Sequence, residues 1–134
     1  MLKGLNHITI AVSDLERSLA FYIELLGMKG HVRWDGGAYL SHGGVWFCLS
    51  RDKPAPSLDY SHIALTIAGP GFSAFSAKLR EAGVTEWKQN SSEGQSVYFL
   101  DPDGHKLEVH CGNLQMRLDA LKHKPYSGLV WLSE

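Results

Sequence analysis

The chain has 134 residues, of which 13 are Lys or Arg and 14 are Asp or Glu. This length predicts a single domain with a core of its own. The balanced charge offers no basic field to nucleic acid or to an anionic membrane, and the apolar runs are too short to span a bilayer. Two cysteines without metal-type spacing, Cys48 and Cys111, favour a reducing cytoplasm. We therefore expect a cytoplasmic protein that has neither nucleic acid nor membrane as a partner.

The chain repeats one order of elements twice. An alternating strand over residues 5–12 leads into a helix that ends near Gly27, and a second strand over 60–68 leads into a helix over 71–82. Each strand carries a histidine at the equivalent position, His7 and His62. Three short strands are predicted after each helix, over 30–35, 37–41 and 44–50 in the first copy and over 84–88, 96–100 and 105–110 in the second. The pattern predicts an α+β fold of two tandem βαβββ modules.

We divide the single domain, residues 1–134, into a first module, a linker, a second module and a C-terminal helix with a tail. Their expected bounds are 5–50, 51–59, 60–112 and 113–134. Ser13 is expected to cap the first helix, with Glu16 completing a capping box. Two βαβββ modules can enclose a cavity, and strand parity places the polar candidates on the faces opposite the helix-packed core.

A divalent metal site is the first hypothesis for the duplicated histidines. His7, His62 and Glu108 form the expected ligand set, and two imidazoles with one carboxylate suit Mn, Fe, Zn, Ni or Co. Taken singly, each histidine could be structural, but two histidines at one module position favour a shared site. His110, on the strand face of Glu108, is the main rival ligand. Cys48 stands in the first module where Glu108 stands in the second, either as a position vacated for substrate or as a small core residue.

Several segments resemble known proteins. The histidine strands and the segment Asp101-Pro102-Asp103-Gly104-His105-Lys106-Leu107-Glu108 resemble the vicinal oxygen chelate superfamily, also called glyoxalase/bleomycin-resistance/dioxygenase. More specific segments are similar to the glutathione-dependent fosfomycin-resistance transferases of the FosA type, and together they span essentially the whole chain. They are Gly4-Leu5-Asn6-His7, Trp34-Asp35, Gly37-Ala38-Tyr39-Leu40, Trp46, Cys48-Leu49-Ser50, Trp87-Lys88, Asn90, Ser92-Glu93-Gly94, Tyr98-Phe99-Leu100, Gly112-Asn113-Leu114, Arg117-Leu118, Pro125-Tyr126 and Gly128.

This resemblance implies a glyoxalase-like fold, dimeric with exchanged modules, so that His7 comes from one subunit and His62 with Glu108 from the other. It implies Mn²⁺ and K⁺ as cofactors and glutathione and fosfomycin as substrates. Thr9 would lie beside the reacting epoxide carbon, and Tyr39 would help to activate the thiol. The implied phosphonate ligands are Lys88, Ser92, Tyr98 and Arg117; the potassium ligands are Asn90, Ser92, Glu93, Gly94 and Ser96; the glutathione site is Trp34, Tyr39 and Trp46.

The implied chemistry needs no protein nucleophile, because the glutathione thiolate attacks the epoxide while the metal stabilises the alkoxide. The chain departs from the family pattern at Ser91, where an arginine is common, and thiol affinity is expected to be altered. Three alternatives share the fold. A glyoxalase-I-type isomerase would need a fourth ligand at Cys48, an extradiol dioxygenase would require oxygen, and a drug-binding module would lack the metal centre.

Overall fold

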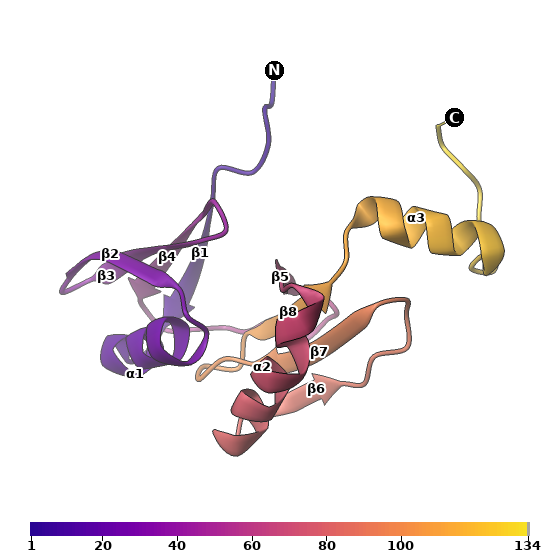
Figure 1. Cartoon of the computed structure of the whole chain (residues 1–134). Coiled ribbons are helices and arrows are strands. Elements are labelled where there is room, and N and C mark those ends of the chain that lie inside the picture. The colour runs from indigo at the N-terminus through magenta and orange to yellow at the C-terminus, as the bar shows by residue number, and fades with distance from the viewer. Residues whose placement is uncertain (134) are drawn as a thin grey trace.

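The computed structural model describes residues 1–133, so that Glu134, the end of the expected tail, lies outside the described residues. Two four-stranded sheets lie beside each other, each accompanied by one helical segment, and a third helix extends from the second sheet toward the C-terminus (Figure 1). The first module contains β1 His7–Val12, α1 Leu15–Leu19, η1 Ala20–Leu25, β2 Lys29–Trp34, β3 Gly37–His42 and β4 Val45–Arg51. The second contains β5 Ile63–Thr66, α2 Gly69–Glu81, β6 Glu86–Lys88, β7 Gln95–Leu100 and β8 Lys106–Cys111, before α3 Leu114–His123.

The two sheets have the same topology. Their strand orders are β1-β4-β3-β2 and β5-β8-β7-β6, and in each the first strand runs parallel to the last while the remaining pairs are antiparallel. The α+β fold of two βαβββ modules is therefore confirmed. The strand over 60–68 is shorter than expected, because β5 begins at Ile63 and leaves His62 immediately before it.

The first helix begins one residue later than expected. Asp14, not Ser13, is the N-cap, and its carboxylate accepts a hydrogen bond from the Arg17 amide at 3.1 Å. Ser13 instead donates its amide and hydroxyl to Asp103 in the second module. A contact 90 residues away in sequence thus displaces the local capping box.

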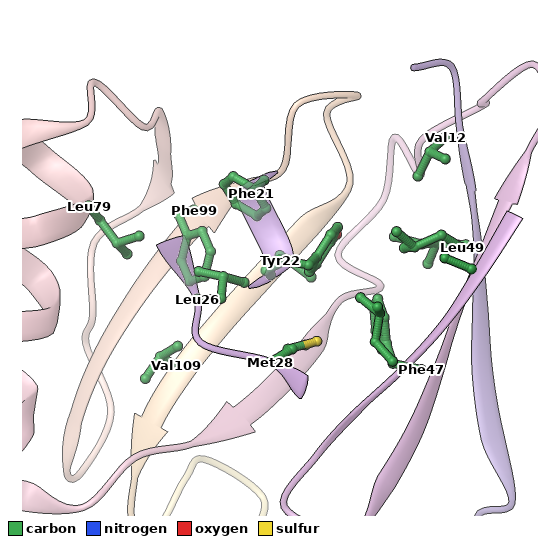
Figure 2. Close-up of a cluster of buried hydrophobic side chains, with 14 of the residues drawn as sticks. Val12, Phe21, Tyr22, Leu26, Met28, Phe47, Leu49, Leu79, Phe99 and Val109 are labelled. Carbon is green, nitrogen blue, oxygen red and sulfur yellow. The ribbon is translucent and has the colours of Figure 1, made fainter. Parts of the chain in front are cut away.

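The helix then widens into η1, a π-helical turn in which the Leu26 amide donates to the Phe21 carbonyl at 3.0 Å. Such single π turns are rare and interrupt an otherwise α-helical segment. Phe21 and Tyr22, both in this turn, are buried, at 9% and 0% exposure. Their rings lie between the modules in Figure 2, Phe21 near Phe99 and Tyr22 near Phe47, with centroid separations of 6.3 and 5.1 Å.

A set of hydrogen bonds, here called the inter-module clamp, joins the first module to the turn before β8. The buried Tyr22 hydroxyl donates to Asp101 at 2.7 Å, Arg17 and Ser13 donate to Asp103, and the His105 Nε2 lies 2.6 Å from the Ala11 carbonyl. The clamp holds the end of β1 beside the beginning of β8. The clamp thereby fixes how the two modules of one chain are placed relative to each other. None of the helices that the structure describes is long and apolar enough to cross a bilayer.

Candidate active site

His62 and Glu108 form the centre of the candidate site on the open face of the second sheet. The His62 Nε2 lies 3.0 Å from Glu108 Oε1, and the His62 Nδ1 lies 2.7 Å from the Tyr60 carbonyl oxygen. Because a carbonyl only accepts, Nδ1 carries the proton that is donated to Tyr60. A neutral His62 therefore presents the Nε2 lone pair to the carboxylate. Two electron-pair donors thus converge, a contact that requires either a proton on Nε2 or a cation bound by both groups.

The spacing and chemistry of this pair suit a divalent metal. Two donors about 2.1 Å from one ion, at right angles, lie about 3.0 Å apart. The Tyr60 carbonyl fixes the ring in the way that outer hydrogen bonds fix metal-binding histidines. Within residues 1–133, however, no group of three or more His, Cys, Asp or Glu side chains is arranged to hold a metal. His7 is not part of the His62–Glu108 pair; it is exposed, bonded to Asn6 and stacked on Trp46.

Lys88 and Tyr98 lie beside this pair. Tyr98 is opposite Glu108 across β7 and β8. Burial, and secondarily the negative charge of Glu108, raises the pKa of the Tyr98 phenol, so that it remains a neutral donor. The Lys88 Nζ is 4.8 Å from the centre of the Tyr98 ring and donates to the Tyr60 hydroxyl, a hydrogen bond that raises the pKa of Lys88. The open face therefore presents an ammonium group and a phenol near the His62–Glu108 pair.

The loop between β6 and β7, residues 89–94, is closed by its own side chains. Asn90 donates to the Gly94 carbonyl at 2.8 Å and accepts from the amide and hydroxyl of Ser92, each at 3.2 Å. Its Glu93 accepts a hydrogen bond from the Arg117 Nε at 2.8 Å. The loop therefore carries carbonyl, hydroxyl and carboxylate oxygens, the donor types that hard monovalent and divalent cations prefer.

Arg117 of α3 reaches this loop. Its guanidinium also donates to the Ser92 hydroxyl at 3.3 Å, and the hydrogen bond to Glu93 raises the pKa of Arg117. A pocket of about 430 Å³ separates the loop from α3 and is lined by Ser91, Ser92, Glu93, Arg117, Ala120, Leu121, Lys124, Pro125 and Tyr126. The four expected phosphonate ligands thus lie in two groups, Lys88 with Tyr98 and Ser92 with Arg117.

Ser96, another expected potassium ligand, points toward Glu108 and His110. Its hydroxyl donates to Glu108 Oε2 at 2.7 Å and lies 2.6 Å from the His110 Nδ1. Ser96 is therefore bonded to a candidate metal ligand, which the pattern of the sequence did not indicate.

The open face of the first sheet carries a continuous row of rings. His7 stacks on Trp46 at 4.4 Å, Trp46 meets Tyr39 at 5.2 Å, and Tyr39 meets Trp34 at 4.8 Å between centroids. The three aromatic side chains keep between 39% and 44% of their surface exposed. Thr9 is exposed on the same face, and its strand partner in β4 is Cys48, which is buried. A patch of exposed aromatic rings of this extent is typical of a surface that binds a ligand or another protein.

Sequence reasoning missed Tyr60. This residue accepts from His62 through its backbone and from Lys88 through its hydroxyl, so it connects two candidate groups. Its position two residues before His62, on the same face of the strand expected over 60–68, was the available signal.

Residues 4–109 match the Glyoxalase/Bleomycin resistance protein/Dioxygenase superfamily. The chain belongs to this superfamily. Glutathione transferase FosA of Serratia marcescens is 54% identical over 139 residues, which cover 100% of this chain and 99% of that protein. Metallothiol transferase FosB of Staphylococcus epidermidis is 38% identical over 134 residues, with 94% and 96% of the two chains covered. The predicted superfamily and its FosA-type branch of glutathione transferases are therefore confirmed.

Solved structures of this superfamily agree with the fold. The fosfomycin resistance protein FosX from Listeria monocytogenes superimposes with a TM-score of 0.81 at 29% identity, with 90% of this chain and 99% of that chain covered. A structure of the same protein in complex with Mn(II) and sulfate gives a TM-score of 0.79 at 29% identity, covering 90% and 98%. The glyoxalase-like architecture predicted from the repeat is thus confirmed.

Proposed function

We propose that this chain adds the glutathione thiol to the epoxide carbon of fosfomycin, which opens the ring and inactivates the antibiotic. The observation that carries the proposal is the 54% identity to Glutathione transferase FosA along the whole chain. The site supports it, because the second module presents a His–Glu pair beside an ammonium group and a phenol, and Arg117 of α3 adds a guanidinium at the neighbouring loop. An isomerase of the same fold is disfavoured, since the buried Cys48 stands where it would need a fourth ligand.

His62 and Glu108 would hold Mn²⁺ or another divalent ion together with His7 of a second subunit. The Mn(II) present in the FosX complex supports this choice of metal. When bound, the metal would offset the negative charge that develops on the epoxide oxygen as the ring opens. Thr9, which shares a strand face with His7, would lie beside the carbon under attack.

The phosphonate of fosfomycin would be bound by Lys88, Ser92, Tyr98 and Arg117. An ammonium and a guanidinium orient such an anion through charge-assisted hydrogen bonds, and a neutral phenol adds a donor. Glu93 neutralises part of the charge of Arg117. A K⁺ ion would be bound by Asn90, Ser92, Glu93, Gly94 and Ser96. Because this ion would engage the Glu93 carboxylate, more of the positive charge of Arg117 would be left for the substrate. Ser96 can contribute only its remaining lone pair, because Glu108 and His110 already use the hydroxyl.

Glutathione would lie along the ring row of Trp34, Tyr39 and Trp46, with the Tyr39 hydroxyl helping to remove the thiol proton. The exposure of these rings supports the assignment, since a peptide can cover them. The thiolate itself attacks the epoxide carbon, so the chain supplies no nucleophile and the buried Cys48 has no role in the bond formed. A homodimer with exchanged modules would bring this row to the His62–Glu108 face. The use of glutathione also supports a cytoplasmic location.

The test is the detection of the glutathione–fosfomycin adduct by mass spectrometry. Purified protein is mixed with both substrates, with and without Mn²⁺ and K⁺. We expect an adduct only when the divalent metal is present, and more of it with K⁺. A parallel reaction with L-cysteine in place of glutathione measures thiol selectivity, which the Ser91 departure is expected to affect.

Variants of the metal pair provide the control. Glu108→Ala and His62→Ala should each abolish Mn²⁺ binding and adduct formation, whereas His123→Gln, on the exposed side of α3, should change neither. Adduct formation by both metal-pair variants, or no adduct from the wild type with any divalent metal, would contradict the proposed function.

A further inference from the structure

His110 makes contacts that suit neither a core residue nor a solvent-exposed histidine. Its ring lies on the open face of β8, two residues after Glu108, with only 15% of its side chain exposed. The Nδ1 is 2.6 Å from the Ser96 hydroxyl and 3.7 Å from Glu108 Oε2, and the Nε2 is 3.8 Å from Glu93 Oε1. Only the contact with Ser96 is short enough to be a hydrogen bond. His110 therefore acts on its surroundings through Ser96.

The two hydrogen bonds of the Ser96 hydroxyl show which group donates and which accepts. Its hydroxyl has one proton, which it donates to Glu108 Oε2 at 2.7 Å. It must therefore accept from His110, so Nδ1 of that ring carries a proton. The chain of hydrogen bonds thus runs from His110 Nδ1 through the Ser96 hydroxyl to Glu108 Oε2, the carboxylate oxygen that does not contact His62. The second oxygen, Oε1, remains directed at the His62 Nε2.

Two glycines make room for the His110 ring. A Cβ on Gly94 would approach the ring Cε1 to 2.8 Å, and a Cβ on Gly112 would approach the Nε2 to 2.8 Å. Both glycines have positive φ, +78° and +148°. Glycine therefore permits the backbone conformation at these positions and also avoids contact between a side chain and the His110 ring. A side chain at either position would collide with the ring, so glycine at both positions leaves room for His110 beside Ser96.

We propose that His110 is a positioning residue, which orients the candidate metal ligand Glu108 through the Ser96 hydroxyl. This inference rests on the proposed function, because it assumes that His62 and Glu108 hold a divalent metal. A carboxylate held at one oxygen presents the other in a fixed direction, and such outer hydrogen bonds raise the affinity of metal sites. In this role His110 does not coordinate the metal but orients a residue that does.

The test compares Mn²⁺ affinities of full-length variants, measured by electron paramagnetic resonance titration without substrate. In His110→Asn the amide can occupy the place of Nδ1 and donate to Ser96, whereas in His110→Gln it reaches the place of Nε2 and leaves Ser96 without its donor. We expect Gln to weaken Mn²⁺ binding about 10- to 100-fold, as loss of an outer-shell partner does. Asn should recover most of that affinity. Equal affinities in Asn, Gln and wild type would overturn the inference.

A second readout separates positioning from direct ligation. The electron spin echo signal of bound Mn²⁺ counts coordinated nitrogens, and His110→Asn should leave that count unchanged. Loss of one nitrogen would overturn the inference, since His110 would then be a ligand.

The proposed function has an independent control in His62→Ala. If His62→Ala binds Mn²⁺ as tightly as the wild type does, the proposed metal centre is refuted. If His62→Ala loses Mn²⁺ binding but His110→Asn and His110→Gln bind Mn²⁺ equally well, only the positioning role is refuted.

Discussion

Tyr22 shows how one side chain connects the two modules. Its ring is fully buried beside Phe47, and its hydroxyl donates to Asp101 at 2.7 Å. Asp101 is itself 4% exposed and accepts the amides of Asp103 and His105 with its other oxygen. A carboxylate this deep needs each of its donors, because a lost partner leaves a desolvated charge.

Tyr22→Phe should therefore lower the free energy of unfolding at pH 7 by about 1–3 kcal/mol, since the apolar packing remains but Asp101 loses a donor. Urea denaturation followed by fluorescence measures the difference. Tyr126→Phe, at an exposed tyrosine, is the matched control and should cost less than about 0.5 kcal/mol. Equal losses in the two variants would show that the buried hydrogen bond is not important for stability.

The same tyrosine predicts a pH dependence. Burial, with the nearby charge of Asp101, raises the pKa of Tyr22 well above its ordinary value of 10.0. The folded state thus retains a proton that the unfolded state releases near pH 10, so stability is complete below pH 10 and falls above it by about 1.4 kcal/mol per pH unit. The stability gap between wild type and Tyr22→Phe should therefore narrow between pH 10 and 11. A gap that stays constant over this range would contradict the assignment.

Arg117 gives a residue-scale prediction about substrate. Arg117→Ala removes a guanidinium that lies beside Ser92 and Glu93, so fosfomycin should bind more weakly while Mn²⁺ affinity is preserved. Loss of one charge-assisted contact corresponds to about 1.5–3 kcal/mol, or roughly a 10- to 150-fold rise in KM for fosfomycin. Steady-state kinetics measure this rise. Arg80→Ala, a surface arginine paired with Glu86, should leave the fosfomycin KM unchanged. An unaltered KM in Arg117→Ala would remove Arg117 from the phosphonate set.

At the scale of elements, local patterns predicted most of the structure. The alternating runs located seven of the eight strands closely, and Asn113 caps α3 where the sequence indicated a helix start. The misplaced features depend on distant residues. Ser13 is not the N-cap because Asp103 engages it, and the π turn of η1 carries Phe21 and Tyr22, which contact Phe99 and Asp101 of the second module. Neither constraint can be read from a window of a dozen residues.

The inter-module clamp also makes a prediction at this scale. Asp103 is almost completely buried and accepts from Ser13 and Arg17 at the start of the first helix. Asp103→Ala should lower the free energy of unfolding by about 1–3 kcal/mol, because the Ser13 amide and hydroxyl lose their acceptor. Asp35→Ala, at an exposed carboxylate in the turn before β3, is the control. Urea denaturation should separate the two variants, and indistinguishable midpoints would show that the clamp contributes little.

At the scale of the whole molecule, the chain leaves both candidate half-sites open. The ring row of the first sheet remains exposed, α3 has no buried residue, and Leu114 and Met116 keep 73% and 49% of their surface exposed. The duplicated histidine predicted one shared site, whereas within residues 1–133 only His62 lies beside Glu108, and His7 lies apart from the pair. In the proposed dimer, His7 of a second copy would complete the site. A homodimer with exchanged modules would cover these apolar surfaces and complete each site from two chains.

This arrangement makes a complementation prediction. His7→Ala and His62→Ala should each be inactive alone. In a mixed dimer with exchanged modules, one site combines both defects, while the other combines the intact His62 of the first variant with the intact His7 of the second. Random exchange of equal amounts makes half of the dimers mixed, each with one of its two sites intact, so about a quarter of wild-type activity should return. The measurement is adduct formation after co-refolding of the two variants, with each variant refolded alone as control. If each site belonged to a single chain, every site would keep one defect, and mixing would restore nothing.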